Sequence, residues 1–150
     1  MRRAIELAME NVRASRGGPF GAVIARAGEI LAEGTNLVTA TNDPTAHAEI
    51  VAIRAACRKL GRFELAGCEV YTSCEPCPMC LGAIYWARPQ RVYFAATHQD
   101  AAGAGFDDSM IYRELAAPPV ERRIPMESLL REEALEVFRA WERSPDKVTY

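Results

Sequence analysis

The sequence has little of what would place it in a membrane, in an export pathway or on a polyanion. Its longest apolar run, residues 79–87, is short and includes Gly82, whereas a helix needs roughly 20 apolar residues to span a bilayer. Glu6 and Glu10 interrupt what would have to be the apolar centre of a signal peptide. The formal net charge is only -2, so no overall excess of positive charge attracts nucleic acid or an anionic membrane. We therefore expect a cytosolic protein with no membrane partner, and the charge disfavours a nucleic-acid partner, although it leaves room for a local basic patch.

Cysteines are few and odd in number, which argues against a disulfide framework. The chain has five, at positions 57, 68, 74, 77 and 80, and three of them fall in one short segment. Such a distribution is typical of a metal or redox site in a reducing compartment.

The remaining composition is that of one globular domain with a buried core, because the 150 residues are 49% hydrophobic and 25% charged. We expect residues 1–150 to form a single domain, without internal repeats. Ile5, Ala8, Met9 and Val12 recur at helical spacing and predict an amphipathic helix at residues 2–16. The other expected elements are a hairpin of strands at 22–25 and 30–32, a polar loop at 39–45, a helix at 46–60, a strand at 68–72, a helix at 77–87, a strand at 91–95, a short helix at 109–115, and a final helix with Leu130, Ala134, Val137, Phe138 and Trp141 on one face. This order predicts an α/β domain whose central sheet is covered on both faces.

Two short motifs each follow a loop and stand at the start of a predicted helix. They are His47-Ala48-Glu49 and Pro76-Cys77-Pro78-Met79-Cys80. Unpaired N–H groups and the positive end of the helix dipole favour the thiolate form of cysteines in a first helical turn. One histidine and two cysteines are the ligand set of a catalytic zinc site that leaves its fourth position to water. Zinc lowers the pKa of that water toward about 7, which produces a hydroxide nucleophile at neutral pH.

Glu49 follows His47 by two residues, so its carboxylate can approach the same small volume without binding the metal. Its useful role there is to take a proton from the water and return it to a leaving group. Two other site types stay open. Cys74 is available as the fourth ligand of a closed structural zinc, and the Cys-x-x-Cys-x-x-Cys run superficially suggests an iron–sulfur cluster. The two motifs together, in this order, favour the open catalytic site.

A His-x-Glu motif followed by Pro-Cys-x-x-Cys is the signature of zinc nucleobase deaminases, and the sequence resembles the cytidine deaminase superfamily. It is similar, more narrowly, to the bacterial guanine deaminases of that superfamily. The resemblance covers residues 17–23, 42–49, 71–86 and 101–109. Within the superfamily, the run Phe106-Asp107-Asp108-Ser109 is the part that indicates guanine as the substrate. It implies a three-layer α/β/α cytidine-deaminase-like fold with a central mixed sheet. It also implies hydrolysis of the free purine base guanine to xanthine and ammonia, a step in purine catabolism or salvage.

The resemblance further implies roles for individual residues. One Zn²⁺ per chain would be held by His47, Cys77 and Cys80, with Glu49 as proton shuttle. Asp108 would assist proton transfer to the departing amino group. The residues implied to contact the purine are Asn36, which reads the base, Phe20, which supplies an aromatic wall, Ala48 and Tyr150. The family also exchanges a C-terminal segment between two subunits, so we expect a homodimer in which residues from about 127 to 150 are exchanged and Tyr150 closes the partner's pocket.

Taken by residue type alone, several of these positions have simpler explanations. Asn36 is a turn residue near a strand end, Asp107 or Asp108 could cap the helix that starts near Ser109, and Phe20 is ordinary core. The remaining expectations are a frayed terminus at Tyr150, core positions for Cys57 and Cys68, a small buried hydrophobe at Cys74, and a surface or loop position for His98.

Three other functions stay open. A tRNA adenosine deaminase shares the zinc core but needs a basic surface for its polyanionic substrate; Arg88, Arg91, Arg122 and Arg123 are available, although the net charge weighs against it. Cytosine, guanosine or another aminated heterocycle is a second possibility, because the zinc chemistry is indifferent to which ring carries the amine. A noncatalytic zinc-stabilised interaction module would explain the ligands but not Glu49.

Overall fold

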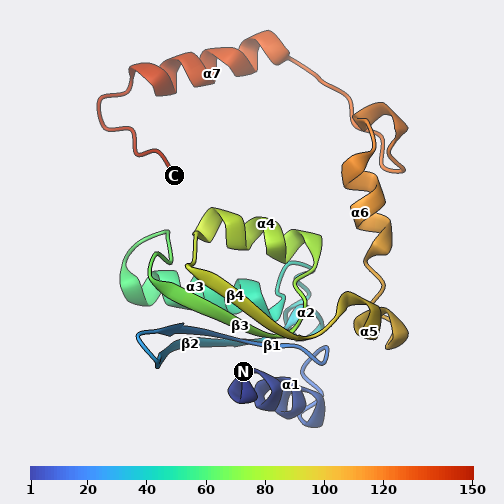
Figure 1. Cartoon of the computed structure of the whole chain (residues 1–150). Helices are drawn as coiled ribbons and strands as arrows, with labels where there is room; N and C mark the ends of the chain where they lie inside the picture. The colour runs from blue at the N-terminus through green and yellow to red at the C-terminus, as the bar shows by residue number, and fades with distance from the viewer. The chain divides into compact units, whose positions relative to one another are not determined.

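The computed structural model describes all 150 residues and divides them into two compact units, Met1–Asp108 and Ser109–Tyr150 (Figure 1). The first unit contains α1 (Arg2–Arg13), β1 (Gly21–Arg26), β2 (Glu29–Thr35), α2 (Val38–Thr41), α3 (Ala48–Leu60), β3 (Cys68–Cys74), α4 (Pro78–Ala87), β4 (Arg91–Ala96) and α5 (His98–Gly103). The second unit contains α6 (Ser109–Ala116), a 3-10 turn (Pro119–Glu121) and α7 (Arg131–Arg143). No helix is both long enough and apolar enough to cross a membrane.

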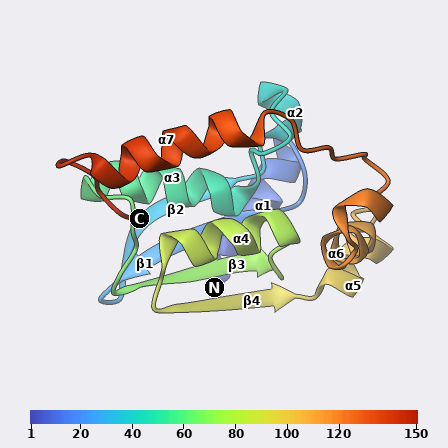
Figure 2. The same cartoon turned by 90° about the horizontal axis from the view of Figure 1, so that it is seen from above.

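The first unit is built on a four-stranded mixed sheet in the order β2-β1-β3-β4. Strand β1 pairs antiparallel with both β2 and β3, whereas β3 and β4 are parallel and are joined through α4. Helix α1 covers one face of the sheet, and α3 and α4 lie side by side over the other (Figures 1 and 2). These three layers confirm the α/β/α architecture expected from the sequence.

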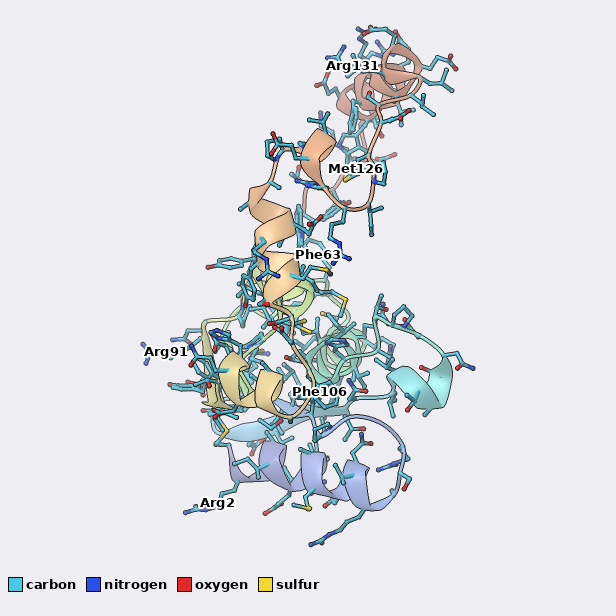
Figure 3. The ribbon with its side chains drawn as sticks, turned by 90° about the vertical axis from the view of Figure 1, so that its right-hand side faces the viewer. Arg2, Phe63, Arg91, Phe106, Met126 and Arg131 are labelled. Atoms are coloured by element: carbon cyan, nitrogen blue, oxygen red, sulfur yellow. The ribbon has the colours of Figure 1, made fainter.

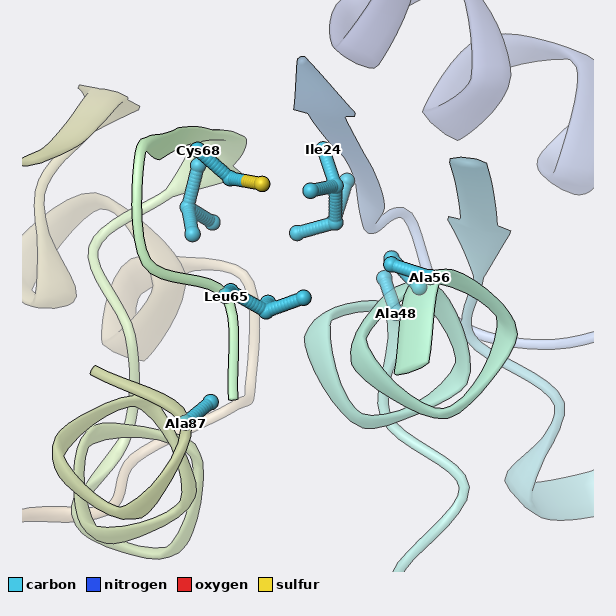
Figure 4. Close-up of a cluster of buried hydrophobic side chains, with 9 residues drawn as sticks. Ile24, Ala48, Ala56, Leu65, Cys68 and Ala87 are labelled. Atoms are coloured by element: carbon cyan, nitrogen blue, oxygen red, sulfur yellow. The ribbon is translucent and has the colours of Figure 1, made fainter. Parts of the chain in front are cut away.

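The larger core cluster lies between the sheet and the pair α3 and α4 (Figure 4). Strand β3 shows the period-two burial of a sheet that faces two environments, since its buried residues alternate with less buried ones. Small side chains on α3, among them Ala48 and Ala52, let the helix approach the sheet closely. A Cβ atom at Gly34 in β2 would overlap the carbonyl oxygen of Ala48, so glycine is required there. The start of α3 is therefore set by direct backbone packing against β2.

The buried face of α1 differs from the apolar face that the sequence predicted. The buried residues are Ala4, Leu7, Ala8 and Asn11. Of the apolar residues singled out from the sequence only Ala8 is buried, because Ile5, Met9 and Val12 are about half exposed on the adjacent side of the helix. A second stripe at the same helical period, made of smaller residues, packs against the sheet.

The structure corrects two further expectations about local structure and adds one helix. The polar loop expected at 39–45 is partly helical, because α2 extends to Thr41. Helix α5, which no predicted element covers, follows β4 and begins with a capping box between Thr97 and Asp100. Leu130 does not lie on the face of the final helix but is its N-cap, with a left-handed φ of 54°. The remaining predicted helices and strands are present with ends shifted by a few residues.

Candidate active site

The site is formed where α3 and α4 begin. His47 is the N-cap of α3 and Cys77 is the N-cap of α4, and both have extended backbones. Pro78 occupies the first turn of α4, where its missing N–H costs no hydrogen bond and its fixed φ suits a helix. Cys80 follows in the same turn and is buried. Two helix starts thus bring together residues that are 30 positions apart in sequence.

The three predicted ligands converge with the spacing of a metal site. Nδ1 of His47 lies 3.5 Å from Sγ of Cys77 and 3.5 Å from Sγ of Cys80. The three donor atoms all lie within 4.8 Å of one another. Zinc bonded tetrahedrally at its usual distances separates a nitrogen from a sulfur ligand by about 3.6 Å. The donor set and its geometry therefore fit a zinc ion with three protein ligands.

Cys74 is not part of this group. Its buried Sγ donates a hydrogen bond to the carbonyl oxygen of Thr97 at 3.5 Å. Burial raises the pKa of Cys74 to about 11, so it is a thiol at neutral pH. A fourth cysteine ligand and an iron–sulfur arrangement are both disfavoured. Cys57 and Cys68 belong to the core region as predicted, and all five cysteines are free.

The two ligand thiols share one proton unequally. A hydrogen bond from Cys80, supported by one from His47, lowers the pKa of Cys77 to about 4. The neighbouring Cys77 thiolate and burial raise the pKa of Cys80. The hydrogen bond to Cys77 also raises the pKa of His47. The sulfur of Cys77 therefore carries negative charge at neutral pH at the position where a cation would bind.

Glu49 lies beside the ligands but outside the group of donor atoms. Its side chain is buried, with 6% of the residue exposed. Burial raises the pKa of Glu49, and the negative charge of Cys77 raises it further, while Cys80 donates a hydrogen bond that lowers it. A carboxyl group with a raised pKa is suited to accept and return protons near neutral pH.

Asp108 is close enough to the ligands for the charge of Cys77 to act on it. Burial raises the pKa of Asp108, and the Cys77 thiolate adds to this rise, while His98 opposes it. Asp108 is half-buried, whereas Asp107 is exposed. The segment that carries Asp108 follows α5 and includes Phe106 (Figure 3), whose ring meets the Phe20 ring edge-to-face at 4.9 Å between centroids.

Asn36 lies buried at the end of β2, with 6% exposed. Its Oδ1 accepts hydrogen bonds from the backbone N–H groups of Gly18 and Val38, both at 3.3 Å. Two N–H donors identify this atom as the amide oxygen, so Nδ2 is the atom oriented away from them. The backbone N–H of Asn36 donates to the carbonyl oxygen of Phe20 at 3.1 Å. Hydrogen bonds therefore connect Asn36 directly to the loop that carries Gly18 and Phe20.

The other two residues expected to contact the purine are placed differently. The Ala48 side chain is fully buried in the core, so a contact with substrate would have to come from its backbone at the start of α3. Tyr150 belongs to the second unit, where 67% of it is exposed.

The sequence reasoning missed a contact between Glu75 and His98. Oε2 of Glu75 accepts the backbone N–H of His98 at 3.0 Å and lies 2.8 Å from its Nδ1. The pair ties the loop that precedes Cys77 to the start of α5. The only signal in the sequence was a carboxylate between Cys74 and the ligand Cys77, and nothing in the spacing connected it to a residue 23 positions away.

Comparisons with known proteins point the same way as the geometry. Residues 1–96 match the profile of the cytidine and deoxycytidylate deaminase zinc-binding region. Over all 150 residues the chain is 58% identical to guanine deaminase of Bacillus subtilis (strain 168), covering 96% of that protein. The X-ray structure of guanine deaminase from Bacillus subtilis matches with a TM-score of 0.97, over 99% of this chain and 95% of that one. A tRNA-specific adenosine deaminase of Aquifex aeolicus is 39% identical over 80% of this chain and 77% of its own length.

Substitutions at Cys77 and Cys74 should show that Cys77 binds zinc and that Cys74 does not. Cys77→Ser removes a thiolate donor. We expect wild-type protein to contain about one zinc ion per chain and the variant to contain far less. Elemental analysis of the purified proteins measures the zinc content. Cys74→Ala is the matched control and should keep its zinc. Full zinc in Cys77→Ser, or an iron–sulfur absorption band in the wild type, would contradict the assignment.

Proposed function

Because the chain belongs to the cytidine and deoxycytidylate deaminase zinc-binding family, we propose that it is a zinc-dependent guanine deaminase, which converts guanine and water to xanthine and ammonia. The observation that carries this proposal is the 58% identity to a guanine deaminase along the entire chain. The chemistry of the site agrees with it, since a histidine and two cysteines lie next to a buried carboxyl group.

His47, Cys77 and Cys80 would hold the zinc ion, which supplies a Lewis acid that makes water nucleophilic at neutral pH. In the net reaction the water oxygen bonds to the amino-bearing ring carbon, and the bond from that carbon to the amino nitrogen breaks. The water gives up two protons, one of which leaves with the ammonia. Protein groups are therefore needed to accept a proton and to return it at the ring and at the leaving nitrogen.

Glu49 is the group that would carry these protons. Its burial excludes competing water and its raised pKa lets it alternate between the acid and the carboxylate. Asp108 would assist at the departing amino group. The half-buried position of Asp108 and the influence of the Cys77 charge on it support this choice over the exposed Asp107.

Asn36 and Phe20 would bind the purine. Because Oδ1 of Asn36 accepts from two backbone N–H groups, its Nδ2 would donate to an acceptor on the purine, a ring nitrogen or the carbonyl oxygen. The Phe20 ring, supported edge-to-face by Phe106, would form an apolar wall. Ala48 would contribute through its backbone.

We further propose a homodimer in which two copies exchange their C-terminal segments, from about residue 127 to residue 150. Residues 1–150 would then form a single domain, whose C-terminal part packs on the other copy. Two unpartnered apolar surfaces support this. One face of α7 exposes Val137, Phe138 and Trp141. A groove of about 340 Å³ beside α1 is lined in part by Ile5, Met9 and Val12. Neighbouring apolar residues that share one surface mark an interaction site more often than single scattered ones do. In the proposed dimer α7 of one copy would cover the groove of the other, with Tyr150 closing its pocket.

The expected setting is the cytosol, where a reducing environment keeps the five cysteines as free thiols. There the enzyme would act on a free purine base in purine catabolism or salvage. No specific observation favours a nucleic-acid substrate.

The substrate is tested by measuring ammonia release from guanine, guanosine, adenine, cytosine and a tRNA anticodon stem-loop. We expect guanine to be deaminated and the others to be poor substrates. Glu49→Gln is the control, because it should lose about 10²-fold or more in activity while retaining zinc. Turnover of another compound with guanine inert would refute the substrate and leave the zinc chemistry intact.

The assisting acid is tested with neighbouring amides. Asp108→Asn cannot carry a proton, so kcat on guanine should fall by about 10²-fold or more, whereas Asp107→Asn should change it little. Steady-state kinetics of the two purified variants decide the matter. Nearly full activity in Asp108→Asn would show that this role is filled elsewhere.

The exchange of tails is tested by complementation. A chain that ends at Ser144 lacks Tyr150 and should have low activity alone, although its catalytic residues are intact. When it is co-expressed with a Glu49→Gln chain that carries the full tail, the purified mixed dimer should regain activity and have twice the mass of one chain. A fully active truncated chain would eliminate the cap, and mixed dimers without recovery would eliminate the exchange.

A further inference from the structure

We propose that Asn11 is a positioning residue for purine recognition, whose buried amide fixes the relative placement of Asn36 and the loop that carries Phe20. The proposal rests on the proposed function, in which Asn36 and Phe20 contact the base. Asn11 itself would touch no substrate.

Asn11 lies in the last turn of α1 and is fully buried, with 0% exposed. Its Nδ2 donates one hydrogen bond to the carbonyl oxygen of Gly18 at 2.9 Å and another to the carbonyl oxygen of Asn36 at 2.8 Å. Gly18 belongs to the loop before β1, and Asn36 follows β2. A single amide group therefore connects α1 to the two segments that present the expected base-binding residues.

These two segments also bind each other. The N–H of Gly18 donates to Oδ1 of Asn36, and the N–H of Asn36 donates to the carbonyl oxygen of Phe20. Side chains cannot be accommodated between them, because a Cβ atom at Gly17 would overlap the carbonyl oxygen of Asn36. Asn11 binds both segments from α1 through its two donated hydrogen bonds. Without Asn11, the carbonyl oxygens of Gly18 and Asn36 would lose their common attachment to α1, and the hydrogen bond from Gly18 to Oδ1 of Asn36, which sets the direction of Nδ2, would be held less firmly.

The hydrogen bonds of Asn11 are directed at the two segments and not at its own helix. Its Oδ1 is buried without a hydrogen-bond partner, and an unsatisfied buried acceptor costs stability. The position belongs to the buried stripe formed with Ala4, Leu7 and Ala8, and an apolar residue there would remove that cost but leave the carbonyl oxygen of Asn36 without the Nδ2 donor. The benefit of the asparagine lies in its two donated bonds, both of which end on segments of the expected base-binding pocket.

The test compares Asn11→Ala with Leu7→Ala, a variant that weakens the packing of the same helix without touching Gly18 or Asn36. We expect Asn11→Ala to raise KM for guanine about tenfold, as for the loss of well-placed hydrogen bonds, with kcat and zinc content nearly unchanged. Leu7→Ala should lower the melting temperature and leave KM unchanged. Asn11→Ser, which retains one short donor, should recover part of the affinity and replaces Asn11→Ala if that variant does not fold.

Binding is measured separately in the Glu49→Gln background by equilibrium dialysis with labelled guanine, where the Asn11 variants should show the same loss. An unchanged KM and affinity in both Asn11 variants, or equal changes in Leu7→Ala, would overturn the proposal. Asn36→Ala distinguishes the two levels of the argument. If it leaves KM unchanged, the role of Asn36 in the proposed function fails; if it raises KM while the Asn11 variants do not, only the positioning role of Asn11 fails.

Discussion

The close contact between β2 and the beginning of α3 is the constraint on which the site depends. The ligand atoms must lie about 3.6 Å apart to hold zinc, so small displacements of either helix start would separate them. Gly34 lets the backbone of β2 lie directly against Ala48, the residue between His47 and Glu49. The positions of His47 and Glu49 are thereby set by packing in the core. Strand β3 ends at Cys74, and α4 begins soon after it with Pro78 in its first turn, so that Cys77 and Cys80 lie beside His47.

Electrostatics explains why these residues suit a cation. The Cys77 thiolate raises the pKa of both Cys80 and Glu49, and the charge of Glu49 also raises the pKa of Cys80. Negative charges in such surroundings are unfavourable unless a positive charge compensates them. A divalent ion bound by the two sulfurs and the imidazole would supply that charge and permit both cysteines to ionise. The charge of the donors therefore agrees with their geometry.

The sequence predicted the chemistry better than the packing. The ligands and Glu49 occur at short, characteristic spacings, and the alternation of apolar stretches predicted the layered fold. The buried face of α1 was harder, because the stripe with Ile5 and Met9 and the stripe with Leu7 and Asn11 both fit the helical period. Hydrophobicity favours the first stripe, but close approach to the sheet requires the smaller residues of the second. The contact between Glu75 and His98 joins distant segments and leaves no periodic pattern.

The division of the chain separates the residues of the zinc site from the residue that we propose closes it. All three ligands, Glu49, Asn36, Phe20 and Asp108 precede Ser109 and belong to the first unit. Among the residues that we propose for the site, only Tyr150 belongs to the second unit. Under the proposed function, substitutions in the first unit would change metal binding, proton transfer or base recognition according to the residue replaced. Loss of Tyr150 would act through access of water and retention of the base, since excluding bulk water strengthens the charge interactions of a site. A small neutral substrate suits this arrangement, because it can be enclosed completely, whereas a folded polynucleotide must remain largely outside any pocket of this kind.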